Sequence, residues 1–116
     1  MPDTRELLER AYAAFNARDL DAALATMHPD VDWPNGWEGG RVTGHDGVRQ
    51  YWTRQWAAID PRVEPAEFAT DDLGRTIVTV HTIVRELSGA VVSDGVVTHV
   101  YTFEDGLIRK MEIQPE

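Results

Sequence analysis

The sequence predicts one α+β domain, because its helical and strand patterns are separated along the chain. Apolar residues recur at helical spacing through the first half, to about residue 59. The second half, from about residue 63, is rich in β-branched residues and contains tight-turn signals. Helices followed by a run of antiparallel strands are typical of α+β domains. A length of 116 residues fits a single domain, residues 1–116.

Two helices are expected at the start of the chain. Asp3 and Thr4 can cap the first, whose apolar residues follow helical spacing to about Asn16. Asp19 can cap a second, shorter helix, and Pro29 is expected to end it.

A short strand, a loop and a third helix follow. Residues 31–33 form the strand, and residues 34–47 a glycine-rich loop that lacks the Gly-Lys-Ser/Thr ending of a phosphate-binding loop. Thr43 and Asp46 stand three apart and can cap a helix that runs to about Ile59.

Four strands are expected in the second half. They cover residues 63–68, 76–87, 91–103 and 107–113, and the second and third are long and rich in valine, isoleucine and threonine. Asp-Gly at 105–106 is a strong signal for a tight hairpin between the last two.

The two long strands are apolar on both faces. One face must cover the helices, and a second apolar face is unusual for a small monomer. This favours a homodimer over another cover for the outer face. The residues expected on that outer face are Val78, Val80, Val96 and Val100.

Composition argues against several classes of function. Lys+Arg is 11 and Asp+Glu is 20, so the formal net charge of −9 disfavours nucleic acids and anionic membrane surfaces as partners. There is no cysteine, no apolar run long enough for a membrane span and no signal-peptide pattern, which favours a cytoplasmic protein. The four histidines fall in four different predicted elements, so we expect no metal site and no cofactor.

Several segments resemble the SnoaL-like, nuclear transport factor 2-like superfamily. They are residues 12–33, with Asn-Ala-Arg-Asp-Leu-Asp at 16–21, then residues 44–52 and 99–108. The resemblance implies a curved antiparallel sheet wrapped around N-terminal helices, a conical α+β barrel with an internal pocket. The superfamily includes ketosteroid isomerase, polyketide cyclases and proteins without known catalysis, so the fold does not define the activity.

Three positions of the steroid isomerase can be carried over. That enzyme uses a tyrosine on the first helix, a carboxylate base after the first strand and a protonated aspartic acid on the penultimate strand. Here these positions fall on Ala11, Asn35 and His99. The resemblance therefore implies that this chain lacks that enzyme's tyrosine and base, and Tyr12 lies one step around the helix from the tyrosine position.

Strand and helix periodicity predicts an aromatic-lined pocket. His99 and Tyr101 share one face of their strand because side chains alternate, and the resemblance places that face inward. A mostly apolar pocket with a few polar groups is typical of a small-molecule site, although a filled aromatic core would use the same residue types. The residues expected to bind substrate are Phe15, Trp33, Trp37, Tyr51, Trp52, Trp56, His81, Val97, Phe103, Met111 and Ile113.

The facing of His81 depends on the hairpin between the long strands. A turn over residues 86–89 that pairs Glu86 with Ala90 places His81 on the same face as His99. A two-residue turn would place it on the outer face, since a one-residue slip inverts every side chain. The inward position is favoured.

The function expected is a cofactor-free enzyme of isomerase, cyclase or hydrolase type that acts on an apolar small molecule. His99 is the candidate for proton transfer, with Tyr101 and Asn35 as catalytic hydrogen-bonding partners. A buried histidine that is merely satisfied by hydrogen bonds is the simpler interpretation. Two alternatives remain open, a non-catalytic ligand-binding or carrier domain and a dimerisation module with a filled core.

Overall fold

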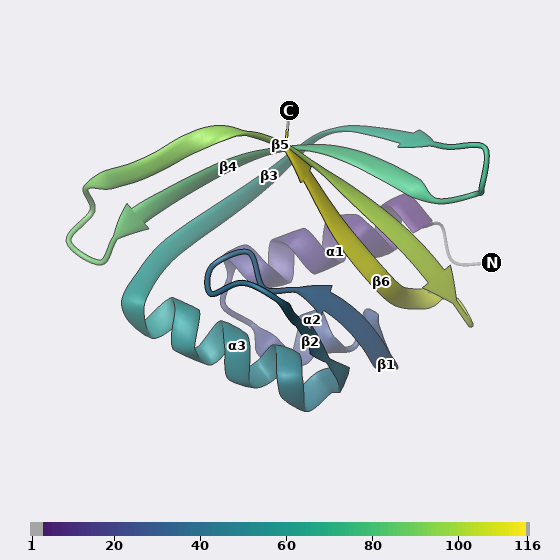
Figure 1. Cartoon of the computed structure of the whole chain (residues 1–116), viewed down its shortest axis with the longest axis horizontal. Helices are drawn as coiled ribbons and strands as arrows, with labels where there is room; N and C mark the ends of the chain where they lie inside the picture. Colours follow the sequence, from purple (N-terminus) through teal and green to yellow (C-terminus); the bar gives the residue numbers. More distant parts are fainter. Residues whose placement is uncertain (1–3, 116) are drawn as a thin grey trace.

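The computed structural model describes residues 4–115 and contains three helices and a six-stranded sheet. The helices are α1 (Thr4–Asn16), α2 (Leu20–Leu24) and α3 (Gly44–Ala58). The strands are β1 (Met27–Pro34), β2 (Arg41–Thr43), β3 (Ile59–Thr70), β4 (Thr76–Glu86), β5 (Val91–Glu104) and β6 (Leu107–Pro115) (Figure 1). None of the helices in this part of the chain has the length and apolar character that a membrane span requires.

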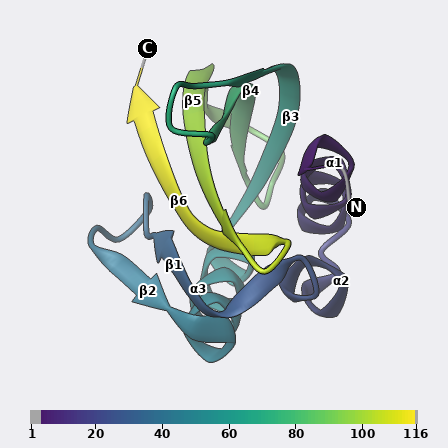
Figure 2. The ribbon, with the colours of Figure 1, turned by 90° about the vertical axis from the view of Figure 1, so that its right-hand side faces the viewer.

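The strands form one open, curved sheet in the order β2-β1-β6-β5-β4-β3. Strands β3 to β6 arch over α1 (Figure 1), while α3 lies beside β1 and β2 (Figure 2). This confirms the α+β fold with a curved sheet around N-terminal helices. One detail differs from the expected antiparallel sheet, because β1 pairs with β6 in parallel. The core lies on the concave side, and its fully buried residues include Leu8, Val31, Val48, Val78 and Ile108.

The end of α2 differs from expectation. Helix α2 begins as predicted, with the Asp19 carboxylate accepting from the Ala22 amide at 3.1 Å, but it ends at Leu24. Pro29 lies within β1, in the irregular stretch between the paired residues Met27 and Asp32, where no ladder hydrogen bond needs its missing N–H.

The 34–47 region contains a short strand that periodicity did not indicate, since β2 has only three residues. Thr43 stands at the start of α3, but its side chain makes no capping hydrogen bond. The expected cap at Asp3 lies outside the described residues.

The last residue of α1 and the segment before α2 join the helices to β3. Asn16 pairs with the backbone of Val63, donating to its carbonyl at 2.7 Å and accepting from its amide at 2.9 Å. Arg18, in the left-handed backbone region with φ 62°, donates to the Asp60 carboxylate and to the Pro61 carbonyl. This segment therefore holds the C-terminal end of α1 against the first residues of β3.

The β4–β5 hairpin has the expected turn but a shifted register. The Glu86 amide donates to the Ala90 carbonyl at 2.8 Å, and Gly89 has φ 103°, as predicted. A bulge beside Arg85 then inserts one residue, so that His81 lies opposite Val96. The expected inward facing of His81 was therefore wrong.

The same bulge corrects the expected outer face. Val78 and Val80 are fully buried on the concave side, with 0% exposure. Val96 is on the outer face with His81 and is 46% exposed, whereas Val100 is 3% exposed. The outer surface proposed for a partner subunit thus loses two of its four valines to the core.

Asn16 offers a direct test of the joint between α1 and β3. Replacing Asn16 with Ala should lower the free energy of unfolding by about 1–3 kcal/mol, because two backbone groups of Val63 lose their partners in a half-buried site. Chemical denaturation would measure this loss. Gln50→Ala, on the exposed side of α3, should change stability by less than about 0.5 kcal/mol, and equal stability of the two variants would contradict the assignment.

Candidate functional site

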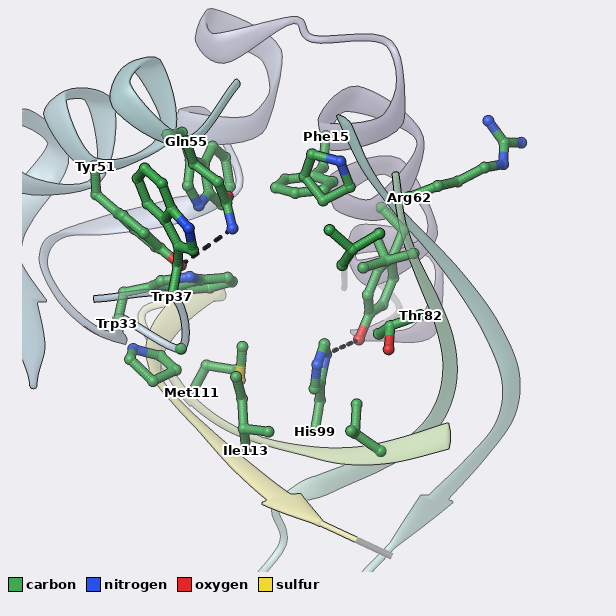
Figure 3. Close-up of a pocket in the computed structure, with 18 of the residues that line it drawn as sticks. Phe15, Trp33, Trp37, Tyr51, Gln55, Arg62, Thr82, His99, Met111 and Ile113 are labelled. Atoms are coloured by element: carbon green, nitrogen blue, oxygen red, sulfur yellow. Dashed lines mark hydrogen bonds between the residues drawn. The ribbon is translucent and has the colours of Figure 1, made fainter. Parts of the chain in front are cut away.

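A cavity of about 380 Å³ opens into the concave side of the sheet. Residues of α1, α3 and every strand except β2 line it, together with the turn after β1. Its floor is buried and largely aromatic, and its rim is exposed at Trp37 and Arg62 (Figure 3). Ser93, which also lines the cavity, is exposed as well. The floor residues include Tyr12, Trp33, Trp52, His99 and Tyr101.

Three polar side chains on the floor form one hydrogen-bonded chain. The Tyr101 hydroxyl donates to the Tyr12 hydroxyl at 2.7 Å, and the Tyr12 oxygen is 2.8 Å from Nδ1 of His99. The Tyr12 ring also stacks near the His99 ring, with centroids 5.9 Å apart. The chain connects α1 with β5, two elements far apart in the sequence.

The direction of this chain determines the tautomer of His99. When Tyr101 donates to Tyr12 and Tyr12 donates to Nδ1, every hydroxyl proton has an acceptor. In the reverse direction the buried Tyr101 proton would have no acceptor among residues 4–115, which costs free energy. We therefore assign the proton of His99 to Nε2, which has no protein partner within the described chain and is not sealed from the cavity.

Burial keeps all three groups neutral. Desolvation lowers the pKa of His99 from 6.5 to about 4, so its imidazole is uncharged at neutral pH. Burial also raises the pKa of Tyr12 and of Tyr101 well above the ordinary value for a phenol. None of the lining residues in the described chain is an aspartate, glutamate or lysine. The cavity therefore presents a neutral N–H donor at His99 within an apolar surround.

Aromatic rings form the other walls of the floor. Trp52 is packed edge-on against Phe15 and Trp33, with ring centroids 5.0 and 5.6 Å apart. Trp33 and Tyr101 lie 6.3 Å apart. Such walls suit a flat apolar molecule, since they offer large contact areas with fixed orientation.

The structure brings together most of the residues predicted for the site. Two of the three predicted catalytic residues and eight of the eleven predicted substrate-binding residues line the cavity. They are His99 and Tyr101, with Phe15, Trp33, Trp37, Tyr51, Trp52, Val97, Met111 and Ile113.

Four predicted site residues do not line the cavity, each for a local reason. Asn35 is buried, but its amide structures the next turn, accepting from the Glu38 amide at 2.7 Å and donating to the Glu38 carboxylate at 2.9 Å. Trp56 is packed behind Phe15, with centroids 5.4 Å apart. Phe103 stacks against Tyr101 within the core, and His81 faces outward because of the bulge.

Tyr12 is the main residue that sequence reasoning missed. It was placed one step away from the functional position on the first helix, yet both Ala11 and Tyr12 line the cavity. The signal was available, because Leu8, Tyr12 and Phe15 follow helical spacing on one face of α1. The polar lining residues Gln55, Thr82 and Ser93 were missed as well, and no pattern distinguished them.

One group in the described chain has the residue types of a metal site. His28, Glu104 and Asp105 place ligand atoms within 4.8 Å of one another. However, Nδ1 of His28 accepts from the Asp30 amide at 3.0 Å, so the proton of a neutral imidazole is on Nε2, which faces Glu104 at 3.1 Å. Both nitrogens are thus engaged, which fits an ion pair or hydrogen bond better than metal ligation.

Comparisons with known proteins agree with this geometry. The family model described as a SnoaL-like domain matches residues 8–111. The chain is similar to TerC, whose crystal structure was obtained with polyporic acid (30% identity, TM-score 0.82, covering 96% of this chain and 89% of TerC). It is also similar to an NTF2-like protein of unknown function from Burkholderia pseudomallei (28% identity, TM-score 0.84, covering 100% and 92%).

A putative polyketide cyclase from Sinorhizobium meliloti is a third similar structure (25% identity, TM-score 0.80, covering 98% of this chain and 95% of that protein). The comparison with curated proteins found no match.

The lowered pKa of His99 predicts acid sensitivity of folding. Between pH 6.5 and about 4 the unfolded chain binds a proton at His99 that the folded protein does not, so the free energy of unfolding falls as pH falls. By pH 4.5 this loss should reach about 2–3 kcal/mol. In His99→Gln the decline from pH 7.5 to pH 4.5 should be smaller by that amount, as measured by urea denaturation at each pH. Parallel declines in both proteins would contradict a neutral buried imidazole, because the carboxylates are common to both.

Proposed function

The chain belongs to the SnoaL-like family, and on that premise we propose that it is a cofactor-free enzyme of the cyclase or isomerase type. It would bind an apolar small molecule with a carbonyl oxygen at Nε2–H of His99. The observation that carries this proposal is the buried Tyr101–Tyr12–His99 chain, which ends in a free N–H inside an aromatic cavity. The lining residues Trp33 and Trp52 would hold the rings of the substrate.

The proposed role of His99 is to stabilise negative charge on the carbonyl oxygen. A hydrogen bond donated by Tyr12 to Nδ1 polarises the imidazole and strengthens Nε2–H as a donor. A fixed donor in a water-poor cavity favours the enolate or alkoxide over the neutral carbonyl. With a pKa of about 4, His99 is a poor base at neutral pH, so it acts on the electrophilic side of the reaction.

A ring closure of aldol type fits these groups. The enol carbon of the substrate attacks a second carbonyl carbon whose oxygen is hydrogen-bonded to His99. One carbon–carbon bond forms, the carbonyl π bond becomes an alkoxide, and that oxygen takes a proton from water while the enol oxygen loses one to water. The product is an isomer of the substrate, so no oxidant or cofactor is consumed.

Similar proteins support a small-molecule site. TerC was crystallised with polyporic acid, and the Sinorhizobium meliloti protein is described as a putative polyketide cyclase. The cavity itself argues against the alternative of a filled core, because about 380 Å³ is left between the aromatic walls.

A non-catalytic binding or carrier protein is the second candidate. One observation favours it, namely that the described lining residues offer no carboxylate or other strong base. The two candidates differ in whether His99 changes the reactivity of a bound ketone or only its affinity.

Exchange of hydrogen for deuterium at the α-carbon of 2-tetralone in D₂O separates the candidates. If His99 stabilises the enolate, the wild type should accelerate exchange over buffer, and His99→Gln should reduce the acceleration by roughly 10²-fold. Proton NMR would follow the exchange, and tryptophan fluorescence would measure the affinity for 2-tetralone.

His81→Gln, a histidine on the outer face, is the matched control and should behave as the wild type. Binding without any acceleration would reject the enzyme and favour the carrier. If 2-tetralone does not bind at millimolar concentration, the proposal of a ligand site fails.

We also propose that two copies of the chain associate through the outer surface of β5, in the cytoplasm. Val91, Val92 and Val96 are each about half exposed there, and exposed apolar patches commonly mark interfaces. Sedimentation equilibrium at micromolar concentration should then give about twice the 13.0 kDa mass of the chain. Val96→Lys should shift the protein to the monomer, and a monomeric wild type would reject the interface.

A further inference from the structure

The cavity has a second polar end, on α3, opposite His99. Gln55 lines the cavity and is half-buried, and its amide nitrogen is 3.4 Å from the Tyr51 hydroxyl. That distance is at the long limit for a hydrogen bond. The Gln55 amide makes no other hydrogen bond within residues 4–115, and its oxygen, which has no partner there, is not sealed from solvent or ligand. The amide therefore has an unused donor and an unused acceptor at the cavity.

Tyr51 supports Gln55 from one turn earlier on the helix. Its side chain is buried, and burial is the main cause of its raised pKa, so the hydroxyl stays protonated. Figure 3 shows the Gln55 amide and the Tyr51 hydroxyl on the α3 side and His99 on the β5 side, with Met111 and Ile113 along the wall between them. The two polar ends are thus neutral and are separated by an apolar stretch.

Charged groups do not compete for this end of the cavity. Arg62 is the one charged side chain among the described lining residues, and its guanidinium points away from the cavity in Figure 3. It donates to the Glu64 carboxylate at 2.7 Å. An anionic ligand would therefore find no paired cation inside and would pay a desolvation cost.

We propose that the substrate is a neutral, flat, ring-containing ketone with a second oxygen at its opposite end, a hydroxyl or carbonyl that hydrogen-bonds to Gln55. The assignment of the ketone to His99 rests on the function proposed above. Because Gln55 offers both a donor and an acceptor, it accepts either a hydroxyl or a carbonyl, while the N–H of His99 requires an acceptor. Gln55 is thus a specificity-determining residue that selects the length and orientation of the ligand.

Three related probes test both ends separately. They are 6-hydroxy-1-tetralone, 1-tetralone, which lacks the hydroxyl, and 5,6,7,8-tetrahydro-2-naphthol, which lacks the ketone. Affinities would be measured by tryptophan fluorescence for the wild type, Gln55→Leu and His99→Phe. Gln50→Leu is the matched control, because it is the same substitution on the exposed side of the same helix.

In the wild type, loss of either oxygen should weaken binding roughly three- to tenfold, the usual net worth of one hydrogen bond. In Gln55→Leu the penalty for losing the hydroxyl should vanish, while the penalty for losing the ketone remains. In His99→Phe the pattern should be the reverse, and Gln50→Leu should match the wild type.

The outcomes distinguish the two proposals. If the hydroxyl penalty is equal in the wild type and Gln55→Leu, the second oxygen site is rejected while His99 keeps its role. If the affinity loss on removing the hydroxyl vanishes in His99→Phe and that on removing the ketone vanishes in Gln55→Leu, the assigned orientation is wrong. If the ketone penalty survives in His99→Phe and the hydroxyl penalty still responds to Gln55, the function proposed for His99 fails. If the fluorescence change does not saturate for any probe with the wild type or any variant, the cavity is rejected as a binding site.

Discussion

The position of α1 across the concave face of the sheet is the constraint on which the site depends. Tyr12 can reach His99 because the end of α1 is held against β3 through Asn16 and Arg18. These residues satisfy backbone groups at the start of β3 that would otherwise lack partners near the helix. The joint therefore fixes α1 in the position from which Tyr12 reaches His99 in the hydrogen-bonded chain.

Burial of three polar side chains is costly unless each finds a partner. Tyr101, Tyr12 and His99 meet this condition by hydrogen-bonding to one another. Their hydrogen-bonded series ends at Nε2–H of His99, which can donate only to a ligand or to water. The same burial that makes His99 neutral also makes it a poor base. Burial thus has two consequences, because a charged imidazole would weaken folding and a neutral one presents Nε2–H to the cavity as a hydrogen-bond donor.

Much of the fold could be predicted from sequence because local signals agree with it. Asp19 caps α2 as expected, and Gly89 and Asp105-Gly106 adopt the left-handed backbone that their turns require. The bulge beside Arg85 could not be predicted, since the valine-rich segments would accept either register with similar burial. That one inserted residue reversed the facing of His81, Val78 and Val80. Helix α2 also ends earlier than Pro29 suggests, because β1 gains pairing with β6 that no local pattern records.

The site was predicted where strand alternation controls facing and was missed where a turn or a helix surface does. His99 and Tyr101 follow from period two on a strand whose direction the resemblance supplied. Asn35 shares that period with Trp33, but a turn follows it. The backbone amides of this turn donate to the side-chain carbonyl of Asn35, which holds that side chain away from the cavity. Tyr12 lies on the same helix face as Phe15. It was missed because the position-by-position comparison with a related enzyme assigned the tyrosine position to Ala11.

The cavity and the surface of this protein have opposite electrostatic character. The chain has a formal net charge of −9, whereas the described cavity lining holds neutral polar groups and one outward-pointing arginine. A negative surface repels anions over long range, and an apolar cavity rejects them at short range. Neutral ketones avoid both penalties, and in the proposed function their oxygens would hydrogen-bond to His99 and Gln55. In the proposed function, selectivity for neutral ligands would follow from the charge of the whole chain. Selectivity among neutral ligands would come from the few inward polar groups, of which His99 and Gln55 lie at opposite ends of the cavity.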